Sequence, residues 1–264
     1  MKGISLSKAE LTANGLLYDR HWMVVGSNGR FVTQREIPHM TMIHTSLDTD
    51  GLVMSMQGHE SIQVPYDIFD GGRIETKVWG DTCETVDQGE NISDWLTKAL
   101  KSKNPLRLVT MIPEFTRPQS KAEILGTETS TQFADAAPFL VANEASLERL
   151  NTELERKSLH KVPMNRFRPN IVVEGLEAFT EHHIATLSAE NYRFKLRGPC
   201  QRCIITTIDQ DTAQKDHNWQ PFNTLKSINP MPGKKAPAFA QYATLSHGDG
   251  HNISVGDHLA AEKS

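Results

Sequence analysis

Short segments rich in β-branched and aromatic residues, separated by turn residues, fill the first hundred positions and constrain the fold most. Residues 22–25 and 31–33 flank Asn28-Gly29, and Asn-Gly between two such segments is a strong hairpin signal. Further strands are expected at residues 51–56, 61–64, 73–78 and 82–86. A spacing of about ten residues between strands favours a barrel or a sandwich.

Helical spacing of apolar residues predicts a helix over residues 92–100, with Glu90 or Asn91 near its cap. A second helix is expected after Asn143, a good N-cap residue, because Leu147, Leu150 and Leu154 then share one face. The polar stretch 113–131 is interpreted as a linker. The second half opens at residues 133–141. The remaining expected elements are strands at 106–110, 170–173, 192–196, 204–208 and 253–259, and a short helix near 222–228.

These elements predict a mainly β chain with some helices (α+β), organised as one β-rich unit over residues 1–115 and another over 116–264. The formal net charge of −4 offers no basic field for nucleic acid or anionic lipid. No apolar run reaches the roughly 20 residues that span a bilayer. Three cysteines are too few for a disulfide framework. We therefore expect free thiols, a reducing compartment and a cytoplasmic location.

The motif Cys200-Gln201-Arg202-Cys203 is the most informative segment for chemistry. Zinc would need further ligands, for which only His247 and His251 form a regular pair. A redox pair would place the first cysteine at a helix start, whereas this motif leads into the strand expected at 204–208. Two buried small side chains are the third interpretation. Arg202 favours a fourth, because a guanidinium beside a thiol stabilises the thiolate that ligates metals.

Two arginine-bearing segments are candidates for holding an anionic group. Arg166-Phe167-Arg168-Pro169-Asn170 precedes an expected strand, and its side chains could hold a phosphate and a heterocycle, or form a solvated basic turn. Arg20 and Arg35 flank the expected hairpin, where Asp19 could instead pair with either of them at the surface. The small residues around Asp135 and Ala136 permit close approach of a ligand or ordinary tight packing.

Four stretches, in this order, resemble the MOSC family. Residues 15–35 (GLLYDRHWMVVGSNGRFVTQR) are similar to the N-terminal β-barrel domain that precedes many MOSC domains. Residues 133–151, 166–175 and 199–209 (FADAAPFLVANEASLERLN, RFRPNIVVEG and PCQRCIITTID) are similar to the MOSC domain itself. The pattern is similar to those of bacterial two-domain MOSC proteins and of mitochondrial amidoxime-reducing components.

The resemblance implies a molybdenum cofactor (molybdopterin) with Cys203 as the catalytic molybdenum ligand and Cys200 as a neighbour. It implies further contacts to the cofactor, which come from Arg20, Arg35, Asp135, Ala136, Arg166, Arg168, Asn170 and Arg202. It also implies an N-terminal domain that lacks its first strand here, together with a Lys-Ser pair of the relatives. We therefore expect the purified chain to hold little cofactor.

The implied activity is reduction of small N-hydroxylated compounds such as amidoximes, hydroxylamines and N-hydroxylated bases. Electrons must come from a separate ferredoxin-like protein or flavoprotein, since the sequence shows no flavin motif and no iron–sulfur domain. No pyridoxal-phosphate domain is expected either. A non-catalytic module that carries the molybdenum cofactor or sulfur is the alternative function. Neither a nucleic acid nor a membrane is expected as a partner.

Overall fold

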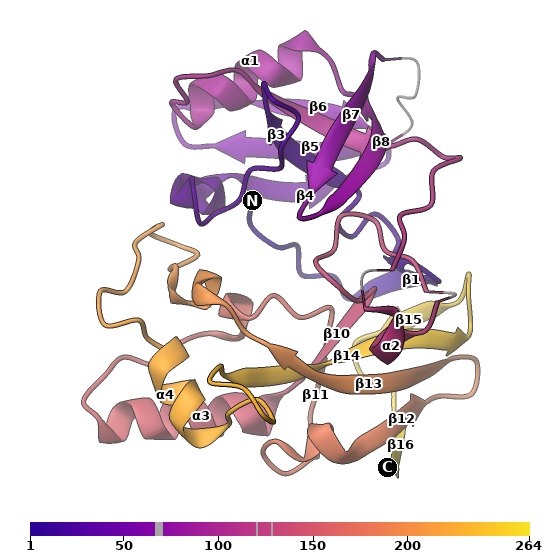
Figure 1. Cartoon of the computed structure of the whole chain (residues 1–264), viewed down its shortest axis with the longest axis vertical. Coiled ribbons are helices and arrows are strands. Elements are labelled where there is room, and N and C mark those ends of the chain that lie inside the picture. The colour runs from indigo at the N-terminus through magenta and orange to yellow at the C-terminus, as the bar shows by residue number, and fades with distance from the viewer. Residues whose placement is uncertain (67–70, 120, 128) are drawn as a thin grey trace. The chain divides into compact units, whose positions relative to one another are not determined.

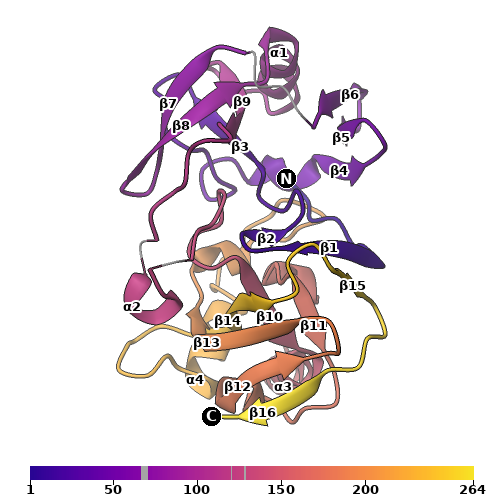
Figure 2. The same ribbon diagram turned by 90° about the vertical axis from the view of Figure 1, so that its right-hand side faces the viewer.

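The computed structural model describes residues 1–66, 71–119, 121–127 and 129–264. It divides into two compact units, which are drawn in Figures 1 and 2. The N-terminal unit comprises residues 1–5, 20–118 and 209–214, and the C-terminal unit comprises residues 6–19, 119–208 and 215–264. The sequence division after residue 115 stays a prediction. Among the described residues, no helix is long and apolar enough to cross a bilayer.

The N-terminal unit is built from two antiparallel sheets and one helix. The sheets have the strand orders β3-β9-β8-β7 and β4-β5-β6. The elements are β3 (Trp22–Gly26), β4 (His44–Leu47), β5 (Gly51–Met56), β6 (His59–Pro65), β7 (Arg73–Val78), β8 (Asp81–Asp87), α1 (Glu90–Ala99), β9 (Leu106–Met111) and the 3-10 helix η1 (Pro38–Met42). Aliphatic side chains from both sheets and from α1 form its core. The expected strands at 51–56, 61–64, 73–78, 82–86 and 106–110 are therefore confirmed.

The hairpin expected around Asn28-Gly29 forms only in part. Val32 N donates to Val24 O over 2.8 Å, but the returning chain makes only isolated bridges, at Arg30 and Phe31, rather than a strand. The segment after the turn also bonds to β7, since Phe31 N donates to Lys77 O. Gly29 lies at φ +70°, and a Cβ there would stand 2.7 Å from the carbonyl oxygen of Glu75. Both the positive φ and the nearby carbonyl oxygen therefore require glycine at this position of the turn.

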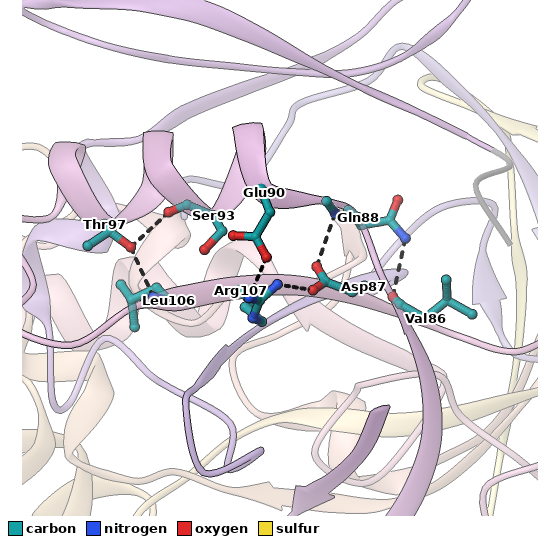
Figure 3. A network of polar contacts seen from close by, with 9 residues as sticks. Val86, Asp87, Gln88, Glu90, Ser93, Thr97, Leu106 and Arg107 are labelled. Carbon is teal, nitrogen blue, oxygen red and sulfur yellow. Dashed lines mark hydrogen bonds and ion pairs between the residues drawn. The ribbon is translucent and has the colours of Figure 1, made fainter. Parts of the chain in front are cut away.

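An ionic cluster fixes the start of α1, whose N-cap lies one or two residues before the expected cap. The N-cap is Gly89 at φ +103°, a conformation that favours glycine. Arg107 of β9 pairs with Asp87 and, over 2.6 Å, with Glu90 in the first helical turn (Figure 3). The N–H of Gly89 donates to Asp87 Oδ1 over 3.0 Å. An acidic residue in the first turn also complements the helix dipole.

The C-terminal unit carries the longer sheet, with the strand order β11-β10-β14-β13-β12-β16, and a small sheet β15-β1-β2. The long strands β13 and β14 run side by side in both views (Figures 1 and 2). The strands are β1 (Lys8–Thr12), β2 (Gly15–Leu16), β10 (Phe139–Asn143), β11 (Ile171–Val173), β12 (Ile184–Ser188), β13 (Arg193–Gln201), β14 (Ala238–His247), β15 (Asn252–Ser254) and β16 (Ala260–Lys263). The helices are α2 (Ala122–Leu125), α3 (Glu144–Arg156), α4 (Phe222–Ile228) and the 3-10 helices η2 (Met164–Arg166), η3 (Thr180–His183) and η4 (Ile204–Thr207).

The architecture confirms the expected mainly β fold, and α3 begins as expected. The Asn143 side chain accepts a hydrogen bond from Ala145 N over 3.2 Å, and the expected leucine face is buried. The helix near 222–228 is also confirmed as α4. The interpretation of residues 113–131 as a plain linker is wrong, because this stretch contains α2.

Two predicted strands are wrong. Residues 204–207 form η4 instead, because the hydroxyl of Thr206 donates to Cys203 O over 3.1 Å and that of Thr207 to Ile204 O over 2.7 Å. Such local bonds compete with a sheet ladder. In the stretch 253–259 only residues 253 and 254 belong to a strand, β15. A turn follows, in which Asp257 Oδ2 accepts from Ser254 N over 2.8 Å, and β16 begins only at residue 260.

A buried carboxylate under the long sheet supports the first prediction. Glu181 is 1% exposed and accepts from the Ser146 hydroxyl over 2.8 Å, while Ser146 accepts from Phe179 N over 2.8 Å. We expect Ser146→Ala to lower the free energy of unfolding by about 2 kcal/mol, because it removes one donor to the buried Glu181 carboxylate, which also accepts from Asn143 Nδ2, and the acceptor of the Phe179 N–H. Urea unfolding measures this. Glu148→Ala, on the exposed face of the same helix, is the control and should change little; equal effects would contradict the prediction.

A second prediction concerns pH and His182. Burial, aided by the charge of His183, lowers the pKa of His182 from 6.5 to about 4. Its Nε2 faces the Asn229 amide over 3.0 Å, a donor that a protonated ring would oppose. As the pH falls, His182 therefore takes up a proton in the unfolded chain before it does so in the folded chain. The free energy of unfolding is full above pH 6.5 and falls as the pH drops towards 4, by at most about 3 kcal/mol. His182→Gln should flatten this slope in urea unfolding, whereas His160→Gln, which is exposed, should not.

Candidate cofactor site

The end of β13 separates the two cysteines of the motif. Cys200 is 5% exposed and Arg202 is 9% exposed, whereas Gln201 and Cys203 are exposed. This alternation is that of an extended chain, in which successive side chains point to opposite faces. The two thiols therefore face away from each other, which disfavours the redox pair. The exposed thiol of Cys203 stands at the N-cap of η4, with its backbone at φ −106° and ψ 176°.

The Arg202 guanidinium contacts the other cysteine. Its Nη1 donates to Cys200 Sγ over 3.0 Å, and its Nη2 donates to the carbonyl oxygen of Phe167 over 2.8 Å. Burial alone lowers the pKa of Arg202, but the charge of Cys200, the hydrogen bond to it and the charge of Cys203 reverse this and raise it. The direct bond thus goes to Cys200 and not to the thiol expected as a metal ligand.

The arginine-rich segment lies against this strand end. Arg166 is buried, and its Nη1 donates to Thr206 O of η4 over 3.3 Å. Phe167 is fully buried and stacks on Phe239, with ring centroids 3.8 Å apart. Arg168 then adopts φ +53°, a left-handed conformation that is uncommon outside glycine. The segment is therefore held on both sides of Arg168, which is half-buried.

Asn170 anchors the start of β11 through its side chain. Its Oδ1 accepts from Leu140 N over 2.9 Å, and its Nδ2 donates to Asp19 Oδ2 over 2.7 Å. We expected Asp19 as a possible surface partner of Arg20 or Arg35, and its carboxylate accepts from Asn170 within the C-terminal unit. One N–H of the Asn170 amide is not used by these bonds. A contact from Asn170 to a cofactor stays a prediction.

Tyr242 joins the site through sheet pairing, and Lys121 joins it through a side-chain contact with Tyr242. Tyr242 lies opposite Gly198 in the pairing of β14 with β13, and Lys121 Nζ donates to its hydroxyl over 3.2 Å. Burial raises the pKa of Tyr242 far above its usual range, and a hydrogen bond and charge interaction with Cys200, together with the charge of Asp135, add to this. No local motif marks either residue. Only the register of the two strands could have revealed Tyr242.

The other candidate residues are distributed over both units of the chain. Asp135 is exposed, while Ala136 is buried and its carbonyl accepts from Gln119 Nε2 over 3.1 Å. Arg20 and Arg35 belong to the N-terminal unit. Arg20 has φ +53°. Arg35 Nε donates to the Thr33 hydroxyl over 3.4 Å, and its guanidinium lies 4.6 Å above the Trp79 ring. Whether they act with residues of the C-terminal unit stays a prediction.

The comparisons with known proteins now decide the family. The model of the MOSC N-terminal beta barrel domain matches residues 1–103, and that of the MOSC domain matches residues 128–260. The chain belongs to the MOSC family. Human mitochondrial amidoxime-reducing component 1 is 35% identical over 97% of this chain and 77% of its own length. Bovine mitochondrial amidoxime reducing component 2 is 34% identical over 86% and 68%.

A third relative carries a different name. Bovine molybdenum cofactor sulfurase is 33% identical over 79% of this chain, which spans 25% of that protein. The names of these relatives associate this MOSC chain with molybdenum cofactor biology. The zinc interpretation gains no support, because the described part of the chain holds no group of three or more His, Cys, Asp or Glu side chains able to bind a metal ion.

The burial of the thiols yields a third prediction. Of the three cysteines, Cys83 and Cys200 are buried and Cys203 is exposed. Titration of the native chain with a colorimetric disulfide reagent should give one fast thiol per chain, and all three after unfolding. Cys203→Ser should abolish the fast phase, and Cys200→Ser should leave it. A fast phase that survives Cys203→Ser would contradict this geometry.

Proposed function

We propose that this MOSC protein binds the molybdenum cofactor through the Cys203 thiolate and reduces small N-hydroxylated compounds. The observation that carries the proposal is the exposed thiol of Cys203 at the end of a strand whose neighbouring Arg202 is buried. The names of the amidoxime-reducing relatives, which match over most of the chain, support the reaction type.

The residues at the strand end fit such a group. A thiolate is a soft donor suited to an electron-rich metal, and Cys203 is the one cysteine of the chain that is accessible. Within the described residues, the Nε of Arg202 is a buried N–H without a hydrogen-bond partner. A buried donor without a partner costs free energy unless a ligand or water accepts from it. The cofactor offers acceptor oxygens and nitrogens of this kind.

We assign the other contacts residue by residue. Arg168 and Asn170 would contact the pterin, and Arg166 would hold the segment that carries them. Arg20 and Arg35 would contact the anionic end of the cofactor, where guanidinium groups bind phosphate oxygens in pairs. Asp135 and the backbone at Ala136 would line the pocket.

When bound, the molybdenum centre supplies the two-electron chemistry that removes oxygen from the substrate. The balanced reaction converts R–NHOH, two electrons and two protons into R–NH2 and water. The chain's own share is to bind and orient the cofactor and the substrate. A separate ferredoxin-like protein or flavoprotein would supply the electrons. Free thiols agree with a reducing compartment such as the cytoplasm.

A module that carries the cofactor or its sulfur without catalysis is the second candidate, favoured by the similarity to molybdenum cofactor sulfurase. The two functions differ in turnover. A carrier would bind the cofactor tightly and release it to another protein. A reductase would consume an N-hydroxylated purine when supplied with the cofactor and an artificial reductant.

The fourth prediction tests the ligand. After loading with isolated molybdenum cofactor, Cys203→Ala should lose bound molybdenum and at least about 100-fold of the turnover, since it removes the metal ligand. Cys200→Ser should be milder, because a hydroxyl can still accept a hydrogen bond in place of the thiol. Metal analysis and the purine assay measure both effects. Equal loss from the two variants would refute Cys203 as the distinct ligand, and molybdenum binding by the unaltered chain without turnover would favour the carrier.

A further inference from the structure

Buried Cys200, three residues before the exposed Cys203, is in contact with other side chains of the site. The sulfur of Cys200 accepts from Arg202 Nη1 over 3.0 Å, and its interaction with Tyr242 contributes to the raised pKa of that hydroxyl. The Tyr242 hydroxyl in turn accepts from Lys121 Nζ over 3.2 Å. On its other side, Arg202 Nη2 reaches the carbonyl of Phe167 over 2.8 Å.

We propose that Cys200 and Arg202 are positioning residues, which clamp the loop at residues 166–170 onto the end of β13 and so set the cofactor contacts of Arg168 and Cys203. The inference rests on the proposed function for its cofactor arm. It assigns Cys200 the role of hydrogen-bond acceptor for a buried guanidinium, whereas the family resemblance implied only that Cys200 is a neighbour of the metal ligand.

The clamp acts on Arg168 through the peptide before it. The Phe167 carbonyl and the N–Cα bond of Arg168 lie in one rigid peptide plane, and φ of Arg168 is the rotation about that N–Cα bond. A bond that fixes the direction of the carbonyl therefore helps to fix φ of Arg168. Arg168 has φ +53°, a conformation that costs free energy in a residue other than glycine and persists only where its surroundings hold it. The bond from Arg202 to the Phe167 carbonyl supplies such a hold.

The same guanidinium also fixes the residue before Cys203. The Arg202 side chain is tied to Cys200 and Phe167, and its backbone N–H donates to Pro237 O over 2.9 Å. The residue before Cys203 and η4 is therefore held by hydrogen bonds of both its side chain and its backbone. A planar guanidinium can make two such bonds in fixed directions, and a lysine ammonium cannot reproduce that fork.

A different view of Cys200, as a small apolar side chain that fills space, makes a different prediction. Alanine and serine would then both be tolerated about equally, and Arg202 would keep its place through Phe167 alone. If the sulfur is needed as an acceptor, serine restores the function that alanine loses. Cys83, fully buried on β8 of the N-terminal unit, provides a matched cysteine with no part in the clamp.

The first arm of the test uses the cofactor-free chain. Hydrogen–deuterium exchange is followed at the amides of Phe167 and Asn170, which donate to Met164 O and Leu140 O over 3.0 and 2.9 Å. We expect exchange to be faster by at least about tenfold in Cys200→Ala and Arg202→Lys, through local opening of the loop. In Cys200→Ser and Cys83→Ala it should stay within about twofold of the unaltered chain. Unchanged exchange in Cys200→Ala would overturn the clamp.

The second arm measures molybdenum per chain after titration with isolated molybdenum cofactor. Loss of such supporting bonds weakens metal-site affinity by about 10–100-fold, which is expected for Cys200→Ala and Arg202→Lys and not for Cys200→Ser or Cys83→Ala. Equal affinity of Cys200→Ala and Cys83→Ala would overturn the cofactor role of the clamp while leaving the proposed function intact. If the unaltered chain binds no molybdenum, the proposed function fails, and the exchange arm still decides whether the clamp exists.

Discussion

The bond network of the buried Arg202 guanidinium is the interaction on which the candidate site depends. Removing a guanidinium from water is costly unless its donors find acceptors. Here one donor reaches a thiol sulfur and another a backbone carbonyl, so that strand β13 and the loop at 166–170 share one charged group. Because the two segments are separated along the chain, this group can fix their relative placement without any help from local sequence.

The neighbouring backbone shows why such fastening is needed. Arg168 sits in a left-handed conformation that costs about 1–3 kcal/mol in strained positions. On one side of it, Phe167 is stacked on Phe239, and on the other, the Asn170 side chain is bonded to Leu140 and to Asp19. The loop is therefore rigid on both flanks of a half-buried arginine. A rigid support of this kind suits a residue that must meet an anionic or heterocyclic group in one orientation.

Local patterns predicted the elements that local physics determines. The leucine face and the Asn143 cap of α3 were readable because helical periodicity and capping act within a few residues. The strand expected at 204–208 was wrong, because β-branched residues favour a sheet while the hydroxyls of Thr206 and Thr207 bond locally and turn the chain into η4.

The parts of the site that sequence could not reveal depend on pairing over long distances. Tyr242 meets the motif only through the register of β14 with β13, and Asp19 meets Asn170 across most of the chain. No spacing within a single segment encodes either contact. The arginines and cysteines could be named as candidates from their chemistry alone, but their partners could not.

The two cysteines illustrate this limit most directly. Within Cys-x-x-Cys the two thiols look equivalent, and zinc or redox chemistry would require both on the same side. In the fold the period of the strand gives them different surroundings, since Cys200 shares the buried face with Arg202 while Cys203 faces outward. A buried thiol held by a guanidinium can support its neighbours but cannot reach a ligand outside. The exposed thiol can bind a metal, provided that the residues behind it do not move. The spacing of the motif therefore places one thiol among the buried side chains and the other at the surface, which is the arrangement that the proposed cofactor site needs.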